Sequence, residues 1–292
     1  MNKTGIAIIG CGDIGSRIAG FLLDSGVSEQ QIYPIVGSRT SKNNLSKQYN
    51  HAIQIDLDEI QYDMDWVEQV EEVFYLVPPQ KNGIDDLRTH RLIHSLYHSQ
   101  SSFKRMVVIS TTGVYGDCHG KWVTEETPIN PTTLRSQRRL SMEQQWQDYA
   151  SEKNILLSIL RVPGIYSFSR LPKERLESGR PIVNPAECGY TNRIHADDLA
   201  KICINVMKHQ RVSDVYNASD GRPGKMSEYF LEVAKFLGIQ RPPVISFSEA
   251  ERKLSSDMMS YLKESRKISN QKIIQTFNLE LQYPDFRQGI QH

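Results

Sequence analysis

The chain has 292 residues, enough for one large hydrophobic core or for a core domain that carries a smaller lobe. Lysine and arginine (35) nearly balance aspartate and glutamate (34), and no segment combines a basic face with interleaved aromatic residues. This composition argues against a nucleic-acid partner or an anionic membrane surface, and it fits a small-molecule partner better.

Targeting segments and metal motifs are not expected either. The apolar run at residues 6–9 is too short for a signal peptide, and no later run reaches membrane-spanning length, so we expect a soluble cytoplasmic protein without a membrane partner. The four cysteines lie far apart, with no C-x-x-C pair and no Cys/His ligand spacing. We therefore expect neither a metal site nor a disulfide framework.

Short apolar runs alternate with helical patterns through the first half of the chain. The helical patterns cover residues 16–25, about 85–99 and about 138–153. The apolar runs are typical of strands that are buried on both faces, and they lie at residues 6–9, 32–36, 52–55, 73–77, 106–109 and 156–160. This alternation predicts an α/β fold with a doubly wound parallel sheet, a Rossmann fold.

The pattern changes after residue 165, where prolines interrupt the chain. Helical patterns resume at residues 195–209, 226–238 and 249–263. We therefore expect a dinucleotide-binding core at residues 1–165 and a smaller C-terminal substrate lobe at residues 166–292, interleaved with the core. The charge-rich stretch 248–272 is expected to be a solvated helical face.

A glycine-rich turn follows the first predicted strand and opens the first predicted helix, the context in which G-x-G-x-x-G is informative. Gly10 permits the tight turn, Gly12 lets the backbone approach a pyrophosphate, and Gly15 allows close packing of the helix. The exposed N–H groups and the helix dipole favour an anion. The predicted phosphate site comprises Gly10, Gly12, Asp13, Ile14 and Gly15.

The end of the second predicted strand indicates which dinucleotide binds. A site that prefers NAD usually has an acidic residue about 20 residues after the glycine turn, whereas this chain has Ser38, Arg39 and Thr40 there. A guanidinium and two hydroxyls suit a 2′-phosphate, so NADP is preferred and NAD is the second choice. The alternative is that Arg39 belongs to a solvated surface loop.

The chain resembles the extended branch of the short-chain dehydrogenase/reductases, the group that includes nucleotide-sugar epimerases and dehydratases. The resemblance rests on six segments in sequence, at residues 10–15, 56–58, 110–116, 161–166, 195–200 and 215–219. It implies that Asp56 and Leu57 lie beside the adenine, and that Val77 and Pro78 flank the cofactor. It also implies that Thr111 takes the catalytic Ser/Thr position, although its hydroxyl could instead satisfy local backbone.

The sequence departs from this family at the catalytic Tyr-x-x-x-Lys pair. Alignment on Pro131 and Glu143 places Arg135 at the position of the Tyr and Arg139 at the position of the Lys. A guanidinium stays protonated at physiological pH, so Arg135 cannot exchange a proton as a tyrosine does. Arg139 keeps the cation that would lie near the nicotinamide ribose. The alternative is a solvated basic helix face that comprises Arg135, Arg138 and Arg139. This pattern resembles the atypical members that lack the pair.

Tyr115 is a candidate replacement for the missing catalytic acid/base. It lies near the C-terminal end of a predicted strand, where ligands of open parallel sheets bind. A phenol needs a nearby cation to act as a base, and the alternative is that Tyr115 packs structurally. His195, with Asp197 and Asp198, is interpreted as a helix-start motif in preference to a base or a metal ligand.

Three arginines are predicted to bind an anionic substrate, namely Arg135, Arg161 and Arg193. For Arg161 and Arg193 the alternative is a buried pair with Asp197 or Asp198. Gly164 stands where nucleotide-sugar enzymes usually have an asparagine that contacts the substrate phosphates, which weakens a nucleotide-sugar interpretation.

Two functions remain open on the sequence. The first is an NADP-dependent oxidoreductase or epimerase-like enzyme that acts on a small carbonyl or sugar-like substrate. The second is a non-catalytic NADP(H)-binding sensor or regulatory protein. Members of the extended branch often dimerise through the helices that correspond to residues 85–99 and 138–153, so the resemblance also implies a homodimer as one oligomeric state.

Overall fold

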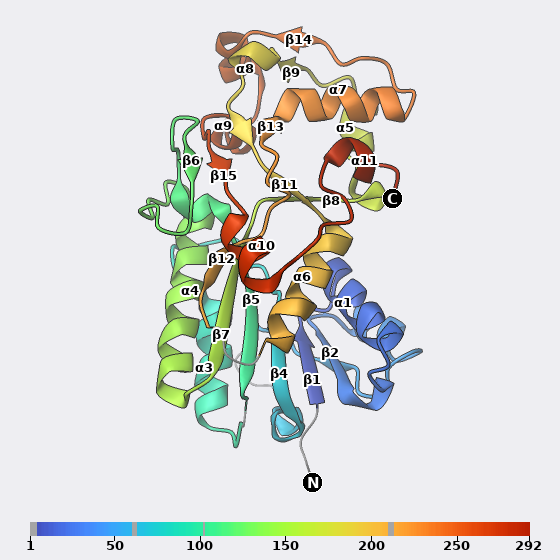
Figure 1. The fold of residues 1–292 in the computed structure, drawn as a ribbon, viewed down its shortest axis with the longest axis vertical. Helices are drawn as coiled ribbons and strands as arrows, with labels where there is room; N and C mark the ends of the chain where they lie inside the picture. Colours follow the sequence, from blue (N-terminus) through green and yellow to red (C-terminus); the bar gives the residue numbers. More distant parts are fainter. Residues whose placement is uncertain (1–4, 60–62, 102, 210–212) are drawn as a thin grey trace. The chain divides into compact units, whose positions relative to one another are not determined.

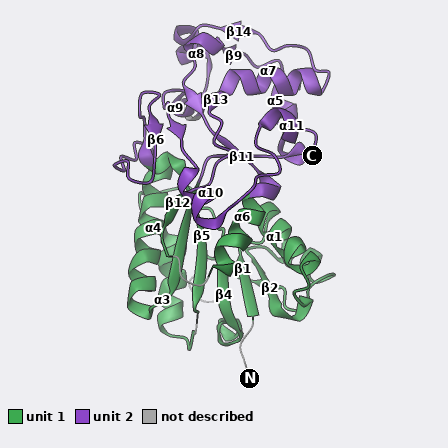
Figure 2. Ribbon diagram, viewed as in Figure 1, with its two compact units in different colours: residues 1–114, 134–161, 199–216 green, residues 115–133, 162–198, 217–292 purple. Residues whose placement is uncertain are grey.

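The computed structural model describes residues 5–59, 63–101, 103–209 and 213–292 (Figure 1). The chain forms two compact units, which Figure 2 colours separately. The first unit comprises residues 1–114, 134–161 and 199–216, and the second comprises residues 115–133, 162–198 and 217–292. Each unit is therefore built from three separate segments of the chain.

A seven-stranded sheet in the order β12-β7-β5-β4-β1-β2-β3 forms the centre of the first unit. Its strands are β1 (Gly5–Ile9), β2 (Ile32–Val36), β3 (Ile53–Gln54), β4 (Val70–Tyr75), β5 (Arg105–Thr111), β7 (Leu156–Val162) and β12 (Val215–Asn217). β1 pairs in parallel with β2 and with β4, and the β2–β3 and β4–β5 pairs are also parallel. The strand order reverses between β1 and β4, and open α/β sheets bind ligands beyond such a switch point.

Helices cover both faces of this sheet (Figure 1). The helices of the first unit are α1 (Asp13–Asp24), α2 (Arg39–Leu45), α3 (Leu87–Tyr97), α4 (Leu134–Lys153) and the greater part of α6 (Ala196–Lys208). Ile9 of β1 shares a buried cluster with Leu92 of α3 and Trp146 of α4, whereas α1 packs on the opposite face, where Ile8 points. The doubly wound α/β fold predicted from the sequence is confirmed.

Two predicted boundaries in the first unit need correction. The fourth strand was expected at residues 73–77, but β4 spans Val70–Tyr75, and Leu76 bonds through its N–H to the Ile9 carbonyl as the chain leaves the sheet. The third helix was expected from about residue 138, but α4 begins at Leu134, which places Arg135 in its first turn.

The second unit is built from short strand pairs and helices. The strand pairs are β6 (Trp122–Val123) with β15 (Lys267–Ile268), β8 (Gly164–Tyr166) with β11 (Arg193–His195), β9 (Ile182–Val183) with β14 (Val244–Ile245), and β10 (Tyr190–Thr191) with β13 (Gly224–Lys225). The helices are α5 (Lys173–Glu177), α7 (Met226–Phe236), α8 (Phe247–Lys253), α9 (Ser256–Leu262), α10 (Gln271–Phe277) and α11 (Phe286–Gly289). Short 3-10 turns lie at Glu29–Gln31, Asp65–Gln69, Thr112–Tyr115, Phe168–Arg170 and Pro185–Glu187.

The charge-rich stretch 248–272 is not one solvated helical face, so this prediction is wrong. The stretch is divided because α8 ends at Lys253, and Ser255 caps α9 through its hydroxyl, which accepts a hydrogen bond from the Met258 N–H at 3.3 Å. Ala250, Met259 and Leu262 are buried in a hydrophobic cluster of the second unit. Among the described residues, every helix is too short or too polar to cross a lipid bilayer.

Candidate functional site

The glycine turn lies where the strand order of the sheet reverses. Gly10 has a φ of +87°, and its N–H bonds to the Ile35 carbonyl at 2.9 Å. A Cβ on Gly10 would come within 3.0 Å of the Val77 backbone nitrogen, at the end of β4. Gly10 is therefore required by the fold, both for its backbone angle and for the close approach of a neighbouring segment.

Gly12 and Gly15 differ in what a side chain would meet. A Cβ on Gly15 would lie 3.0 Å from the Ile8 side chain, so this glycine lets α1 pack closely on β1. A Cβ on Gly12 would meet only the Gly10 carbonyl oxygen, at 4.0 Å. Unlike Gly10 and Gly15, Gly12 therefore has no close neighbour in the protein that a side chain would displace.

The start of α1 fits a phosphate group. Gly12 is the N-cap, and no side chain caps the helix, so the N–H groups of the first turn are not satisfied by a capping residue. Asp13 is exposed in this turn and accepts a hydrogen bond of 3.0 Å from Arg17, while the Ile14 side chain is buried. Burial raises the pKa of Cys11 to about 12, so its thiol stays protonated and inert.

The predicted 2′-phosphate residues lie together at the end of β2. Ser38 is the N-cap of α2, and its hydroxyl accepts a hydrogen bond of 3.2 Å from the Ser41 N–H. Arg39 and Thr40 are the next two residues and are exposed to solvent. The structure therefore places the guanidinium and two hydroxyls at one corner of the sheet, next in order to the glycine turn on β1.

Two arginines of α3 hold the segments that are predicted to flank the adenine. Arg88 donates to Asp58 at 2.8 Å through Nε and to the Pro78 carbonyl at 3.0 Å, so it joins the segment after β3 to the segment after β4. Arg91 donates to the Leu57 carbonyl at 3.1 Å. The hydrogen bond from Arg88 also holds the pKa of the Asp58 carboxyl below its ordinary value.

In the segment after β3, Asp56 is exposed, and its carboxylate accepts a hydrogen bond of 3.0 Å from the Asp58 N–H. Leu57 is buried. The supporting role of Arg88 and Arg91 was missed by sequence reasoning. Their spacing of three residues, which puts both on one face of α3, was the only sequence signal, and their partners are about 30 residues away in the sequence.

Arg139 connects the ends of two central strands. Its guanidinium donates to the Val77 carbonyl at 2.9 Å and to the Ile109 carbonyl at 3.3 Å. Burial lowers its pKa, although an arginine remains charged at neutral pH. The neighbouring Arg138 is buried and donates to the Gly83 carbonyl. The alternative of a solvated basic face is therefore wrong for these two arginines, whereas Arg135 is half-buried.

Thr111 is the last residue of β5 and is partly exposed. Its hydroxyl accepts a hydrogen bond of 3.1 Å from the Gly113 N–H, as the structural alternative anticipated. A threonine hydroxyl has two acceptor lone pairs and one donor proton, so this bond does not use the proton that a substrate oxygen would accept.

Arg161 forms a buried ion pair, which does not support its predicted contact with substrate. Its guanidinium donates to the Glu143 carboxylate at 2.8 Å, and both side chains are at most 5% exposed. The Ser110 hydroxyl donates to the same carboxylate. The partner that the structure describes is Glu143 of α4, a proximity to Arg161 of β7 that sequence spacing does not reveal.

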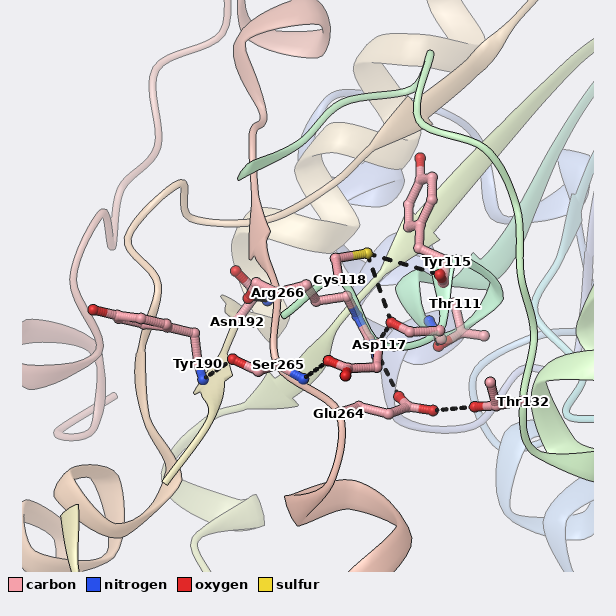
Figure 3. A network of polar contacts seen from close by, with 12 residues as sticks. Thr111, Tyr115, Asp117, Cys118, Thr132, Tyr190, Asn192, Glu264, Ser265 and Arg266 are labelled. Carbon is pink, nitrogen blue, oxygen red and sulfur yellow. Dashed lines mark hydrogen bonds and ion pairs between the residues drawn. The ribbon is translucent and has the colours of Figure 1, made fainter. Parts of the chain in front are cut away.

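Tyr115 is buried in the second unit, and its hydroxyl donates to Asn217 at 2.9 Å. This placement favours structural packing over the predicted contact with substrate, because the buried Tyr115 hydroxyl already uses its proton in the bond to Asn217. In Figure 3 its neighbour Asp117 accepts a hydrogen bond of 2.9 Å from the Ser265 N–H, and Thr132 donates to Glu264 at 3.1 Å.

These contacts join residues 115–132 to residues 264–268, a tertiary pairing that sequence reasoning missed. Arg266 strengthens the pairing because its guanidinium donates to Glu264 at 2.7 Å and to the Gly116 carbonyl at 2.6 Å. Cys118 lies in the same network, and burial raises the pKa of its thiol (Figure 3).

The segment with His195 is a structural motif, as interpreted from the sequence. His195 is buried, and its Nδ1 accepts a hydrogen bond of 3.2 Å from the Asp197 N–H at the start of α6. Asp198 accepts hydrogen bonds from the N–H groups of Gln282 and Tyr283, at 2.9 and 2.8 Å. Arg193 pairs with neither aspartate and lies instead over the Tyr229 ring, 4.4 Å from its centroid.

Comparison with known proteins agrees with this fold. The model of the NAD-dependent epimerase/dehydratase family matches residues 6–219, which begin in β1 and include the glycine turn. No curated protein matches the sequence.

Solved structures are similar over nearly the whole chain. A functionally unknown conserved protein from Silicibacter pomeroyi has a TM-score of 0.83 at 24% identity, covering 98% of this chain and 96% of that one. UDP-N-acetylglucosamine 4-epimerase from Bacillus cereus has a TM-score of 0.73 at 16% identity, with the same coverage. dTDP-glucose 4,6-dehydratase from Bacillus anthracis, in complex with NAD, has a TM-score of 0.74 at 19% identity, covering 99% and 94%.

At these identities the solved structures establish the fold, and the family match extends over most of the chain. The resemblance to the extended short-chain dehydrogenase/reductases is thereby confirmed, and the chain belongs to the NAD-dependent epimerase/dehydratase family.

Proposed function

We propose that this protein is an NADP-dependent oxidoreductase or epimerase-like enzyme that acts on a small carbonyl or sugar-like compound. The observation that carries the proposal is Gly12, where a missing side chain leaves open space at the uncapped start of α1. A helix start without a capping side chain, where a ligand can approach the backbone N–H groups, is suited to bind a pyrophosphate.

The other predicted cofactor residues have consistent positions in the first unit. Arg39, with Ser38 and Thr40, would bind the 2′-phosphate at the end of β2, and Asp56 and Leu57 would border the adenine. Arg139 would place its cation near the nicotinamide ribose, from its position at the ends of β4 and β5. Val77, Pro78 and the first turn of α1 complete the proposed site.

The bound dinucleotide would accept or donate a hydride. Thr111 would donate its hydroxyl proton in a hydrogen bond to a substrate oxygen and so orient the substrate. Arg135 would act only as a fixed cation, because a guanidinium does not give up its proton near neutral pH. Tyr115 and Arg161 have no part in this proposal, since their polar groups are buried and engaged with Asn217 and Glu143.

Calorimetric titration with NADPH and NADH tests the cofactor assignment. The wild type is expected to bind NADPH more tightly than NADH. Arg39→Ala is expected to weaken NADPH binding by about 10- to 100-fold, the value of a charge-assisted hydrogen bond to phosphate, and to leave NADH unchanged. Lys47→Ala, which removes an exposed cation shortly after α2, is the control and should change neither affinity.

Equal affinity of the wild type for the two dinucleotides would overturn the 2′-phosphate assignment. Binding of neither would overturn the whole proposal.

A second candidate function is a dinucleotide-binding sensor without catalysis. The predicted replacement of the Tyr-Lys pair by Arg135 and Arg139 favours it, and so does the burial of Tyr115, the one phenol that was expected to replace the missing tyrosine. A protein that binds NADPH but never oxidises it, when mixed with a broad panel of aldehydes, ketones and keto sugars, would support this second function over the first.

A further inference from the structure

Arg193 of β11 carries a buried guanidinium that no described side chain or carbonyl satisfies. The residue is 7% exposed, and its guanidinium lies 4.4 Å from the centroid of the Tyr229 ring and 5.4 Å from that of Phe286. Within the described part of the chain these ring contacts are its direct side-chain interactions, with no hydrogen-bond acceptor. A guanidinium has five N–H donors, and no Arg193 nitrogen is among the fully enclosed polar atoms of the described residues, so a small ligand can reach these donors.

A second buried donor without an acceptor lies on the neighbouring strand. The Tyr166 hydroxyl of β8 is buried and has no hydrogen-bond partner among the described residues. β8 and β11 are parallel, with Gly164 beside Arg193 and Tyr166 beside His195. Residues two apart on a strand share a face, so Arg193 and Tyr166 lie on the same face of this strand pair.

Both donors border one aromatic ring. The centroid of the Tyr166 ring is 6.5 Å from that of Tyr229, the ring over which Arg193 lies. Aromatic contacts with a guanidinium use the ring face and leave its in-plane N–H groups available. The Tyr166 hydroxyl also lies against Gly289 of α11, where an added Cβ would come within 2.6 Å of it. An oxygen-bearing anion is the kind of ligand that would satisfy both donors.

Two glycines leave space beside the guanidinium. Gly164, which is exposed, stands next to Arg193 on the adjacent strand, and a Cβ there would have the Asn192 carbonyl at 3.5 Å as its nearest contact. A Cβ on Gly224 would lie 3.8 Å from NH1 of Arg193 and equally far from Oε2 of Glu228. The lack of side chains at these positions gives a small ligand room at the edge of the guanidinium.

Nearby carboxyls do not neutralise Arg193 by direct contact. Asp220 and Glu228 are close enough to influence it electrostatically, but neither forms an ion pair with it in the described structure. Burial raises the pKa of Asp220 to about 7, so that carboxyl is only partly ionised at neutral pH. The guanidinium therefore has no ion-pair partner within the described part of the chain.

We propose that Arg193 and Tyr166 form a subsite in the second unit that binds the carboxylate of a small organic acid. The planar edge of a guanidinium presents paired N–H groups that match the two oxygens of a carboxylate. This inference deepens the proposed function and rests on it where it names the substrate class, a carbonyl or sugar-like compound that carries a carboxylate. The binding of the anion itself is measurable without turnover.

Calorimetric titration of the full chain with succinate at pH 6.5 and low salt tests the subsite. The wild type is expected to bind succinate. Arg193→Met is expected to lose at least 10-fold in affinity, and Tyr166→Phe several-fold, because each removes donors that the carboxylate would use. Arg193→Lys, which keeps the charge but not the paired donors, should fall between wild type and Arg193→Met.

Arg175→Met provides the matched control. Arg175 lies in the same unit, 4.9 Å from the centroid of the Phe230 ring. One of its terminal nitrogens donates to the Pro181 carbonyl at 3.0 Å, and its buried Nε has no partner among the described residues, so the variant controls for the loss of a partly unsatisfied guanidinium. This variant should bind succinate like the wild type. Thermal unfolding of each variant shows whether the second unit remains folded, and Tyr166→Phe keeps the test decisive if Arg193→Met unfolds.

Equal succinate binding by wild type and Arg193→Met, or no binding by a folded wild type, would overturn the subsite. Inorganic phosphate that binds through Arg193 when succinate does not would overturn the carboxylate assignment. NADPH titration on the same samples separates the two proposals, because failure of succinate alone leaves the proposed function standing, and failure of NADPH alone leaves the anion subsite standing.

Discussion

The guanidinium of Arg139 donates a hydrogen bond of 2.9 Å to the carbonyl oxygen of Val77. The same nitrogen lies 3.3 Å from the Ile109 carbonyl, so one cation on α4 joins the segments that follow β4 and end β5. Val77 in turn contacts the position of Gly10, where a Cβ would come within 3.0 Å of the Val77 nitrogen. A residue identified from sequence as a replacement for lysine therefore also supports the turn that is proposed to hold the cofactor.

This relationship predicts different outcomes for two substitutions of Arg139. Arg139→Met leaves two carbonyls without their donor and is expected to destabilise the protein by about 1–3 kcal/mol. Arg139→Lys keeps the charge and one donor, so it should lose less stability and retain more NADPH affinity. Urea unfolding and NADPH titration measure both effects. If Arg139→Met and Arg139→Lys had the same stability and the same NADPH affinity, the charge of Arg139 would have no role in either property.

Gly12→Ala separates ligand binding from folding. The added Cβ meets only the Gly10 carbonyl oxygen at 4.0 Å, so stability should change by less than about 1 kcal/mol, whereas NADPH affinity should fall at least 10-fold. Gly20→Ala is the matched control on the same helix, because a Cβ there meets nothing within 4 Å. It should stabilise the helix slightly and leave NADPH affinity unchanged.

Gly10→Ala provides the opposite case. Its φ of +87° and the close Val77 nitrogen predict a loss of stability as well as of affinity. If Gly12→Ala were as destabilising as Gly10→Ala, the open space at Gly12 would have to be explained by the fold and not by a ligand.

Arg88 is predicted to be a positioning residue for the cofactor. Arg88→Met removes the link from Asp58 to the Pro78 carbonyl and should raise the dissociation constant for NADPH several-fold. Asp58→Asn weakens the same link from its other end. If the two residues act through each other, the double variant should lose no more affinity than Arg88→Met alone, and fully additive losses in the cycle would contradict this role.

The raised pKa of Asp220 predicts that the free energy of unfolding decreases as pH rises. Its pKa is raised from 3.8 to about 7 by burial, so the folded protein binds a proton that the unfolded chain releases between about pH 4 and 7. Stability from this group is present at low pH and lost as pH rises through 7, by at most about 4 kcal/mol. The charged groups that affect it are Arg193 of β11, Arg222 on its own loop and Asp285 before α11.

Asp220→Asn tests this directly. The amide oxygen can still accept the hydrogen bond from the Arg222 N–H, which the wild-type carboxylate accepts at 2.9 Å. Urea unfolding at pH 5.5 and 8.5 should show a smaller pH dependence in the variant than in the wild type. A pH dependence that is the same in both proteins would exclude Asp220 as its source.

Several residues show where sequence reasoning reached its limit. The glycine turn was predictable because its function depends on local order, with a strand before it and a helix after it. Arg161 was predicted to bind substrate or an aspartate of the 195–200 motif, and sequence reasoning did not anticipate its ion pair with Glu143, which lies 18 residues earlier on α4. Tyr115 was a candidate base by its place after β5, but its hydroxyl donates to Asn217, 102 residues later.

The sequence by itself determined the doubly wound sheet, the phosphate turn and the family, because strand alternation and glycine spacing are local patterns with few structural solutions. Only the tertiary structure decided which polar groups are satisfied. Whether an arginine faces a ligand or a carboxylate depends on contacts between segments far apart in the chain. These contacts engaged Arg161 and Tyr115 and left Arg193 and Tyr166 without acceptors among the described residues.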